Sequence, residues 1–240
     1  MLHLTYADLD AEDQPPRSCQ VNYPQDCTNS KHKNGCIIDA ISNQTNLFLD
    51  PNTDTITRQE ALKYLIHFVG DLHQPLHVEN AYRGGNEIPV CFGNACSHNN
   101  LHEVWDKYIP YKITGTKSSA KHDEEVASAQ QWADKLYNTN VLKAKEGGDS
   151  LACGNVQSPN DCSLPWASEA NSYVCSYAMK ESIEWYENND LSGEYYEGAA
   201  PIVEYLIGRA GERLGVYLNA LVQVAQGAQQ VPDEKHAELK

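Results

Sequence analysis

Two histidine–aspartate pairs have the same spacing and could together hold a metal ion. His67 precedes Asp71 by four residues, and His102 precedes Asp106 by four. On a helix this spacing places both side chains of a pair on one face. A third histidine, His77, lies between the pairs. Imidazole and carboxylate are ligands that suit zinc, so these five residues predict a zinc site.

Each pair taken alone has a simpler explanation. One His-x-x-x-Asp pair more often makes a hydrogen bond on a helix surface, but two pairs around a third histidine favour metal binding. His67 stands among apolar residues, where an unpaired imidazole is costly, and a satisfied core histidine is the alternative there. We expect the other histidines to be solvated, with His73 the nearest to the cluster: His32, His73, His98, His122 and His236.

Helices must position these ligands, and the sequence predicts one for each pair. Thr57 with Glu60 three residues later forms a capping box, which opens a helix over 58–72 with apolar residues at helical spacing. Asn100 can cap a second helix that ends before Pro110. Each helix would then carry one histidine–aspartate pair on one of its faces.

The rest of the chain is predicted to be mainly helical, with a short β-hairpin whose first strand is 87–92. Pro201 is expected as the first residue of the last helix. A loop rich in Gly, Ser, Pro and Asn covers 147–163. The further helices are predicted at 36–50, 118–138, 166–188 and 201–226. We therefore predict an all-α, single-domain fold over 1–226, with disulfide-stapled loops and a flexible tail at 227–240.

The hydrophobic content and the net charge limit the classes of protein to which this chain could belong. The 240 residues include 41% hydrophobic ones, enough for a sizeable core. Lys and Arg number 18 against 33 Asp and Glu, a net charge of −15, which disfavours a basic nucleic-acid footprint or a polybasic membrane anchor. A phosphate substrate remains compatible, because bound divalent metals reverse the local charge of a cleft. No apolar run reaches the 18 or so residues of a membrane span, so no membrane partner is expected.

Eight cysteines indicate an oxidising compartment. Three pairs, Cys27–Cys36, Cys91–Cys96 and Cys153–Cys162, each enclose a short polar loop, and no C-x-x-C motif occurs. Cys19 and Cys175 remain and could close a long loop, although the sequence alone permits 105 pairings. These spacings predict local disulfides in a secreted protein.

Two features concern processing. Asn43 begins a glycosylation sequon, which a secreted protein would expose on a loop. The first residues carry no basic region and no apolar core of a signal peptide. A secreted protein without a signal peptide suggests that the natural beginning of the chain is missing.

Several motifs together resemble the zinc-dependent single-strand nucleases of fungi and plants, the S-one/P-one family. The longest is ALKYLIHFVGDLHQPLH at 61–77, which contains three of the five ligands. The resemblance covers about 10–219, and its motifs agree in type, order and approximate spacing. The shorter matching motifs lie at 10–16, 84–86, 100–102, 105–106 and 192–196.

The resemblance implies a mainly helical fold with three zinc ions in a cleft. It implies a secreted, monomeric endonuclease that hydrolyses single-stranded DNA and RNA to 5′-nucleotides and also acts on 3′-nucleotides. His77, His102 and Asp106 would hold one zinc and its bound water, the catalytic nucleophile. His67 and Asp71 would contribute to a second, buried zinc, and Asp71 would bridge to a third.

The resemblance also implies substrate contacts and two of the disulfides. Asp10, Asn86 and Tyr108 match substrate-contact positions of the family. Cys19–Cys175 and Cys27–Cys36 match its disulfides, whereas Cys91–Cys96 and Cys153–Cys162 follow from spacing alone.

The amino-terminal part departs from the family pattern. The family holds its third zinc partly through an N-terminal tryptophan and a histidine soon after it, and neither is present. Ala7 stands where a zinc-binding histidine is expected, so His3 could substitute only if the chain looped differently. Asp8 and Arg83 replace the residues that would enclose a substrate base. The chain as written is therefore expected to lack a complete zinc cluster and to be nearly inactive.

Two other functions fit part of the pattern. A zinc phospholipase C-like phosphodiesterase would share the ligand plan, but 84–86 matches the nucleases and no apolar lipid-facing loop is present. A non-catalytic secreted protein stabilised by one zinc is the alternative outside the enzymes.

Overall fold

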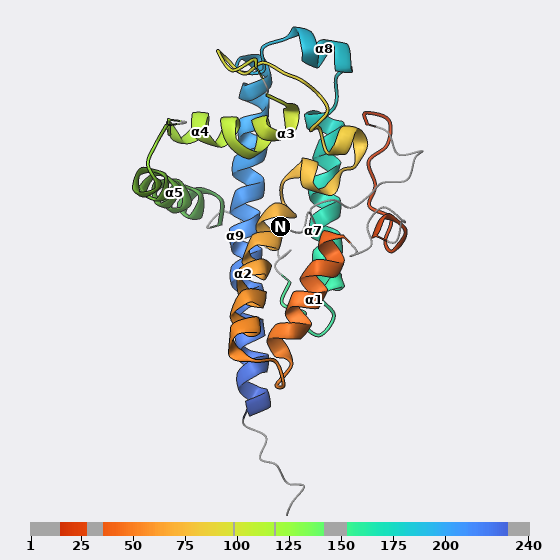
Figure 1. The fold of residues 1–240 in the computed structure, drawn as a ribbon, viewed down its shortest axis with the longest axis vertical. Coiled ribbons are helices and arrows are strands. Elements are labelled where there is room, and N and C mark those ends of the chain that lie inside the picture. Colours follow the sequence, from red (N-terminus) through yellow and green to blue (C-terminus); the bar gives the residue numbers. More distant parts are fainter. Residues whose placement is uncertain (1–14, 28–35, 98, 118, 142–152, 230–240) are drawn as a thin grey trace, which may run out of the picture.

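The computed structural model describes residues 15–27, 36–97, 99–117, 119–141 and 153–229. One long helix, α9 (Glu194–Gln229), runs along the molecule (Figure 1). Three helices lie beside it: α1 (Ile37–Leu49), α2 (Thr55–Asp71) and α7 (Asn160–Tyr173). Three short helices lie near its amino-terminal end: α3 (Leu101–Glu103), α4 (Ile109–Thr114) and α8 (Ile183–Asn188). The longer α5 (His122–Leu136) lies to one side of α9.

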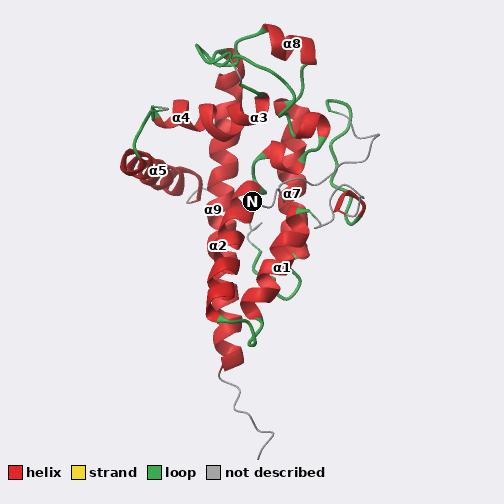
Figure 2. Ribbon diagram, in the orientation of Figure 1, coloured by secondary structure: helices red, strands yellow, loops and turns green. Residues whose placement is uncertain are grey.

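The predicted all-α class is confirmed, and Figure 2 shows helices joined by loops. The expected strand at 87–92 forms only isolated bridges within the described residues. The chain does turn at Gly93, where φ is 61° and the amide of Phe92 donates to the carbonyl of Ala95 at 2.9 Å. The hairpin prediction was therefore correct for the turn and wrong for an extended pair of strands.

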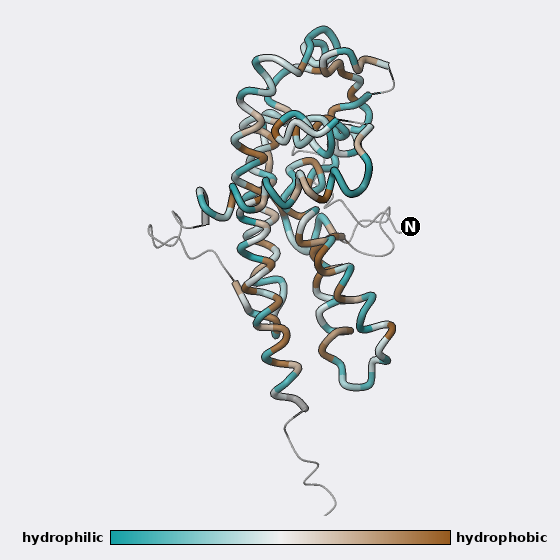
Figure 3. Tube along the Cα trace, turned by 90° about the vertical axis from the view of Figure 1, so that its left-hand side faces the viewer, coloured by the Kyte–Doolittle hydropathy of each residue, from teal (hydrophilic) through white to brown (hydrophobic). Residues whose placement is uncertain are grey.

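Two hydrophobic cores share α9. Apolar and polar residues alternate along the helices, as expected for helices with one buried face (Figure 3). The first core joins α1, α2, α7 and α9, and its buried residues include Ile41, Leu65, Val69, Trp166 and Tyr217. The second core lies at the other end of α9 and includes Trp105, Val174, Tyr186, Tyr195 and Val203. The segment between α2 and α3, which carries His77, belongs to both cores.

The helix that carries His67 and Asp71 starts earlier than predicted. The N-cap of α2 is Asp54, whose carboxylate accepts from the amides of Ile56 and Thr57. The hydroxyl of Thr57 also donates to Asp54, at 2.7 Å. The capping box at Thr57 was therefore wrong, because an aspartate three residues upstream caps the helix and places the amide of Glu60 inside it.

Pro110 and Pro201 do not lie at the helix boundaries that the sequence predicted. A π turn over Val104–Tyr108 follows α3, and the amide of Ile109 donates to the carbonyl of Val104. Pro110 then lies in the first turn of α4, where its missing amide costs little, so the helix continues. Pro201 lies inside α9 rather than at its start, because this helix begins seven residues earlier at Glu194.

Other helix bounds also differ from the predictions. The segment predicted as one helix at 166–188 is α7, a π turn over Val174–Ala178 and, after a break, α8. The loop expected at 147–163 ends sooner, since α7 begins at Asn160. α5 begins at His122 rather than 118. α9 includes 227–229 of the expected tail, and 230–240 lie outside the described residues.

The eight cysteines form four disulfides. Cys91–Cys96 and Cys153–Cys162 pair as their spacing suggested, and Cys27–Cys36 closes a third short loop. Cys19–Cys175 joins residues 156 positions apart and ties the amino-terminal segment to the π turn after α7. No helix in the described part of the chain is long and apolar enough to cross a membrane.

The sequon lies in a helix, not on a loop as expected. Asn43 is exposed on α1. Thr45, two residues later, is fully buried, and its hydroxyl lies 2.8 Å from both the carbonyl of Ile41 and the hydroxyl of Tyr217. The sequon threonine therefore takes part in core packing.

Candidate metal centre

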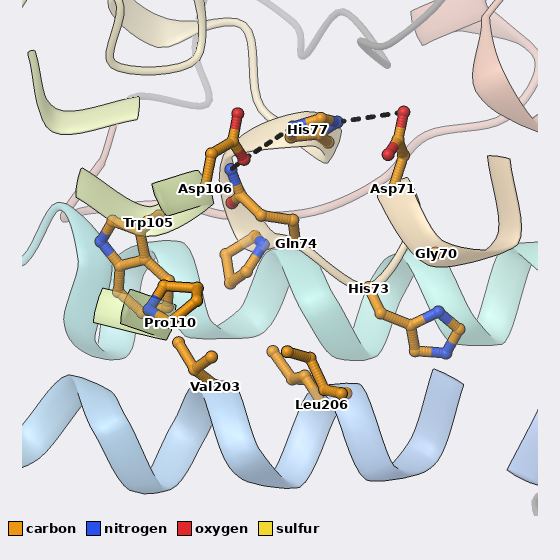
Figure 4. A pocket seen from close by; sticks show the side chains of 12 residues that line it. Gly70, Asp71, His73, Gln74, His77, Trp105, Asp106, Pro110, Val203 and Leu206 are labelled. Carbon is orange, nitrogen blue, oxygen red and sulfur yellow. Dashed lines mark hydrogen bonds and ion pairs between the residues drawn. The ribbon is translucent and has the colours of Figure 1, made fainter. Parts of the chain in front are cut away.

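The predicted ligands converge where α2, the 3₁₀ turn Pro75–Val78 and the π turn after α3 meet (Figure 4). His77 Nε2 lies 3.1 Å from Asp106 Oδ1, and His102 Nε2 lies 3.2 Å from Asp106 Oδ2. The two imidazole rings stack with their centroids 4.8 Å apart. One ligand atom from each of these three residues lies within 4.8 Å of the others, so a single ion could contact all three.

The second pair joins this group through Asp71. Asp71 Oδ2 lies 3.1 Å from His67 Nε2 and 3.6 Å from His77 Nδ1. The five predicted ligands are thus linked from His67 to His102 by successive contacts. Figure 4 shows His77 in the middle, with its two ring nitrogens facing Asp71 and Asp106. Only His77, His102 and Asp106 are compact enough to share one ion, and the other two residues form a neighbouring pair.

The environment of His67 differs from the apolar one expected. Its side chain is 63% exposed, although Leu65 and Val69 beside it in the sequence are buried. The reason is helical geometry, because apolar neighbours in sequence point to other faces of α2. His67 therefore lies at the surface, whereas its partner Asp71 is only 16% exposed.

His102 is held by a tight turn that needs glycine. Gly84 accepts a hydrogen bond from His102 Nδ1 at 2.7 Å, and Gly85 has φ +80°. A Cβ on Gly85 would lie 3.3 Å from Leu76 and 3.4 Å from the amide of His102. Asn100 caps α3 as predicted, since its side chain accepts from the amide of Glu103 at 2.8 Å. These contacts fix the ring and leave Nε2 directed at Asp106.

Charge interactions at the centre favour a shared proton. Burial acts to lower the pKa of His77, but hydrogen bonds to Asp106 and Asp71 outweigh it and raise the pKa to about 9. Burial acts to raise the pKa of Asp106, but the hydrogen bonds from His102 and His77 leave it well below its usual range. The nitrogen that holds this proton is also a ligand nitrogen, so metal binding must release a proton.

The donor set fits zinc. Two imidazoles and a carboxylate are a complete three-ligand set, and the 41% exposed side chain of Asp106 leaves one side open to solvent. His102 Nδ1 donates to a main-chain carbonyl, the outer contact that usually orients a zinc-bound histidine. A second cluster, Cys27, Cys36 and Asp39, does not fit, because its cysteines are joined in a disulfide.

Gln74 is a part of the centre that the sequence did not reveal. Its side-chain amide donates to Asp106 Oδ1 at 2.9 Å, and its Oε1 accepts from the amide of Leu76. Gln74 therefore connects the start of the 3₁₀ turn that carries His77 to the carboxylate 32 residues later. The only local signal is its position just before Pro75, where a side-chain cap is common.

His73 is buried rather than solvated as expected, with 3% of its surface exposed. Burial lowers its pKa to about 3; a hydrogen bond to the carbonyl of Val69 opposes this shift, and the positive charges of Arg213 and Arg209 add to it. Of the other expected solvated histidines, His122 is exposed, and His32, His98 and His236 lie outside the described residues.

The predicted substrate contacts are only partly placed. Asn86 is half-buried, and its side chain donates to the carbonyl of Arg83 at 2.8 Å, next to the turn that holds His102. Tyr108 follows Asp106 in the π turn and packs against Phe92, with ring centroids 5.7 Å apart. Asp10 and His3 lie outside the described residues.

Comparison with known proteins identifies the centre. A family model described as S1/P1 Nuclease matches residues 1–223. The chain belongs to the S1/P1 nuclease family. Nuclease S1 of Aspergillus oryzae is 38% identical over 221 residues, which cover 90% of this chain and 71% of that enzyme. Nuclease P1 of Penicillium citrinum is 34% identical, covering 89% and 75%, and Endonuclease 4 of Arabidopsis thaliana is 31% identical, covering 87% and 68%.

This S1/P1 nuclease is therefore a phosphodiester hydrolase, as predicted. The relatives named above are all nucleases, which decides against the phospholipase C-like alternative. S1/P1 nucleases are zinc enzymes, and the convergence of His77, His102 and Asp106 agrees with that chemistry.

Proposed function

We propose that this nuclease is a secreted, monomeric zinc endonuclease that cleaves single-stranded DNA and RNA to 5′-nucleotides and removes the phosphate of 3′-nucleotides. The observation that carries the proposal is the convergence of His77, His102 and Asp106 within 4.8 Å. Zinc bound there would polarise the phosphodiester and lower the pKa of a water molecule toward neutrality.

The protein's own residues would orient this chemistry. His77 and His102 present Nε2 to different oxygens of Asp106, so both oxygens of the carboxylate are held. The amide of Gln74 holds Oδ1 from a third direction. With both oxygens fixed, the exposed side of Asp106 is where a phosphate could approach.

The zinc content follows from how many ligands each site has. His77, His102 and Asp106 support one fully occupied site. His67 and Asp71 supply two ligands for a second zinc, with Asp71 shared toward a third, so these two are proposed to bind more weakly. Counting zinc ions per chain by mass spectrometry under native conditions tests this order of affinities.

A pocket beside the ligands supports the preference for single strands. It has a volume of about 160 Å³ and lies between the centre and α9 (Figure 4). Trp105, Pro110, Val203 and Leu206 give it apolar walls, while His77 and Asp106 line its polar side. An unstacked base can turn toward such a wall, whereas a base inside a duplex cannot.

The four disulfides support secretion, because such bonds persist in oxidising compartments. The exposed Asn43 of the sequon is a candidate site for a glycan in that setting. Mass spectrometry of protein secreted by its natural host would reveal both the oxidised cysteines and any glycan.

The test of the proposed activity removes one ligand. In a version of the chain that carries the family's amino-terminal zinc ligands, His102→Ala should lose the zinc of the complete site and at least a thousandfold of its rate on single-stranded DNA and on a 3′-nucleotide. The matched control is His122→Ala, which removes an exposed histidine at the start of α5. Near wild-type cleavage by His102→Ala, or equal loss in the control, would refute the assignment.

A further inference from the structure

His73 is held by two hydrogen bonds that admit one arrangement of its ring. It lies on the chain between Asp71 and His77, yet its side chain points away from them (Figure 4). Nδ1 lies 2.7 Å from the carbonyl of Val69, and Nε2 lies 2.9 Å from Arg213 Nη1. A carbonyl only accepts and a guanidinium only donates, so Nδ1 carries the hydrogen and Nε2 accepts.

The partner of His73 is itself fixed. Arg213 on α9 is 1% exposed, and its Nη2 makes an ion pair of 2.5 Å with Glu169 Oε2 on α7. Tyr205 donates to the other oxygen of Glu169 at 2.8 Å. The guanidinium also lies 5.7 Å from the centre of the Trp166 ring. Contacts from α7 and α9 therefore hold the guanidinium of Arg213, which donates to His73.

The main chain from Asp71 to His77 follows successive tight turns, each closed by a hydrogen bond to the carbonyl three residues earlier. The amide of His73 donates to Gly70 at 3.0 Å, that of Gln74 donates to Asp71 at 2.9 Å, and that of His77 donates to Gln74 at 2.9 Å. Leu72 and Leu76 are fully buried and pack these turns into the two cores, but apolar packing alone does not fix polar directions. The imidazole of His73 connects these turns to Arg213.

The path of this turn segment bears on distances in the metal centre. It carries Asp71 on one side and His77 on the other, 3.6 Å apart between Oδ2 and Nδ1. It also carries Gln74, which holds Asp106 at 2.9 Å. His73 is not itself a ligand, since both of its ring nitrogens are used in bonds to Val69 and Arg213.

We propose that His73 and Arg213 are positioning residues, which orient the turn between Asp71 and His77 and thereby set the zinc affinity of the centre. The inference rests on the proposed zinc function. It assigns a role to a buried pair, 140 residues apart in sequence, that is not among the five predicted ligands.

The test compares zinc affinity among folded variants. His73→Phe keeps a flat ring but removes both hydrogen bonds, and we expect it to bind zinc about tenfold more weakly in competition with a chelator, as outer-contact variants of zinc sites do. His73→Gln keeps one donor and one acceptor, and it should recover most of this loss. Circular dichroism at the measuring temperature establishes that each variant is folded.

The matched control is Tyr217→Phe. Tyr217 lies one turn after Arg213 on α9, is fully buried, and its hydroxyl bonds Thr45 on α1 at 2.8 Å. Its loss should lower the melting temperature but leave zinc affinity within twofold. If Tyr217→Phe weakens zinc binding as much as His73→Phe, the role is only structural and the proposal is overturned.

Further outcomes separate this inference from the proposed function. Arg213→Lys replaces a fork that reaches both His73 and Glu169 with a single ammonium, so it should also weaken zinc binding. Wild-type affinity in folded His73→Phe or Arg213→Lys overturns the proposal. Failure of the unaltered protein to bind zinc would instead overturn the proposed function.

Discussion

At the scale of single residues, the role of each histidine depends on what its two ring nitrogens contact. His102 uses Nδ1 for a main-chain carbonyl and turns Nε2 to Asp106, whereas both nitrogens of His73 are used inside the fold. The sequence distinguishes them only partly. The spacing of four identified His67 and His102, but exposure depends on which face of α2 is covered, and that requires the packed structure.

Acidification should destabilise the protein through His73. Its folded pKa of about 3 lies below the ordinary value of 6.5, so its stability contribution is present above pH 6.5 and is lost as the pH falls toward 3. At pH 5 the unfolded chain binds a proton that the folded chain excludes, which costs about 2 kcal/mol. Urea unfolding with chelator present, at pH 7.5 and pH 5, measures this loss.

The control for that experiment is His73→Gln, which cannot titrate. Between pH 7.5 and pH 5, its free energy of unfolding should fall by about 2 kcal/mol less than that of the unaltered protein. Parallel curves for the two proteins would show that other groups cause the acid sensitivity.

Gln74 should affect zinc binding because its side chain orients the carboxylate of Asp106. Gln74→Leu removes the donor to Asp106 Oδ1, and we expect zinc affinity or turnover to fall by about 10- to 100-fold. Gln130→Leu is a matched control, since Gln130 donates to Asp134 at 3.0 Å on the exposed surface of α5. Zinc titration and single-stranded DNA cleavage of both variants would check this, and equal effects would contradict it.

At the scale of elements, apolar periodicity and caps predicted where helices lie better than where they begin and end. Asn100 was correctly recognised as a cap because its partner amide is three residues away. The start of α2 was missed because Asp54 and Thr57 are both plausible caps, and they bond to each other. The passage of the chain through Pro110 depends on a π turn, which leaves no period in the sequence.

The turn that holds His102 should tolerate no side chain at Gly85. Gly85→Ala would cost about 1 kcal/mol for the left-handed backbone, and its Cβ would also press on Leu76 and the amide of His102. Gly115→Ala is the control, because φ there is +70° with nothing within 4 Å. We expect both variants to lose stability, measured by urea unfolding, but only Gly85→Ala to lose zinc affinity. Unchanged zinc affinity in Gly85→Ala would contradict this.

At the scale of the whole molecule, the contacts between residues far apart in the chain could not be predicted from the sequence. The indole of Trp105 donates to the hydroxyl of Tyr195, 90 residues later, and so anchors the residue next to Asp106 on α9. Five metal ligands were predicted because they lie within forty residues and in local motifs. The groups that support them, such as Tyr195 and Arg213, come from the opposite end of the chain and carry no local signal.

The disulfide Cys19–Cys175 should contribute more stability than the short ones. It closes a loop of 156 positions, and replacing both cysteines with serine should cost about 5 kcal/mol through the entropy of the unfolded chain. The control, the same replacement at Cys91–Cys96 with a separation of 5, should cost about 2 kcal/mol. Urea unfolding under non-reducing conditions compares the two, and equal losses would contradict this expectation.

The continuity of α9 has a consequence for how the molecule melts. Its 36 residues supply Tyr195 and Val203 to one core and Tyr217 and Leu221 to the other. Neither core can come apart without fraying the helix that the other core packs against. Heating should therefore produce a single calorimetric transition whose van't Hoff and calorimetric enthalpies agree, and removing zinc should move that one peak rather than split it.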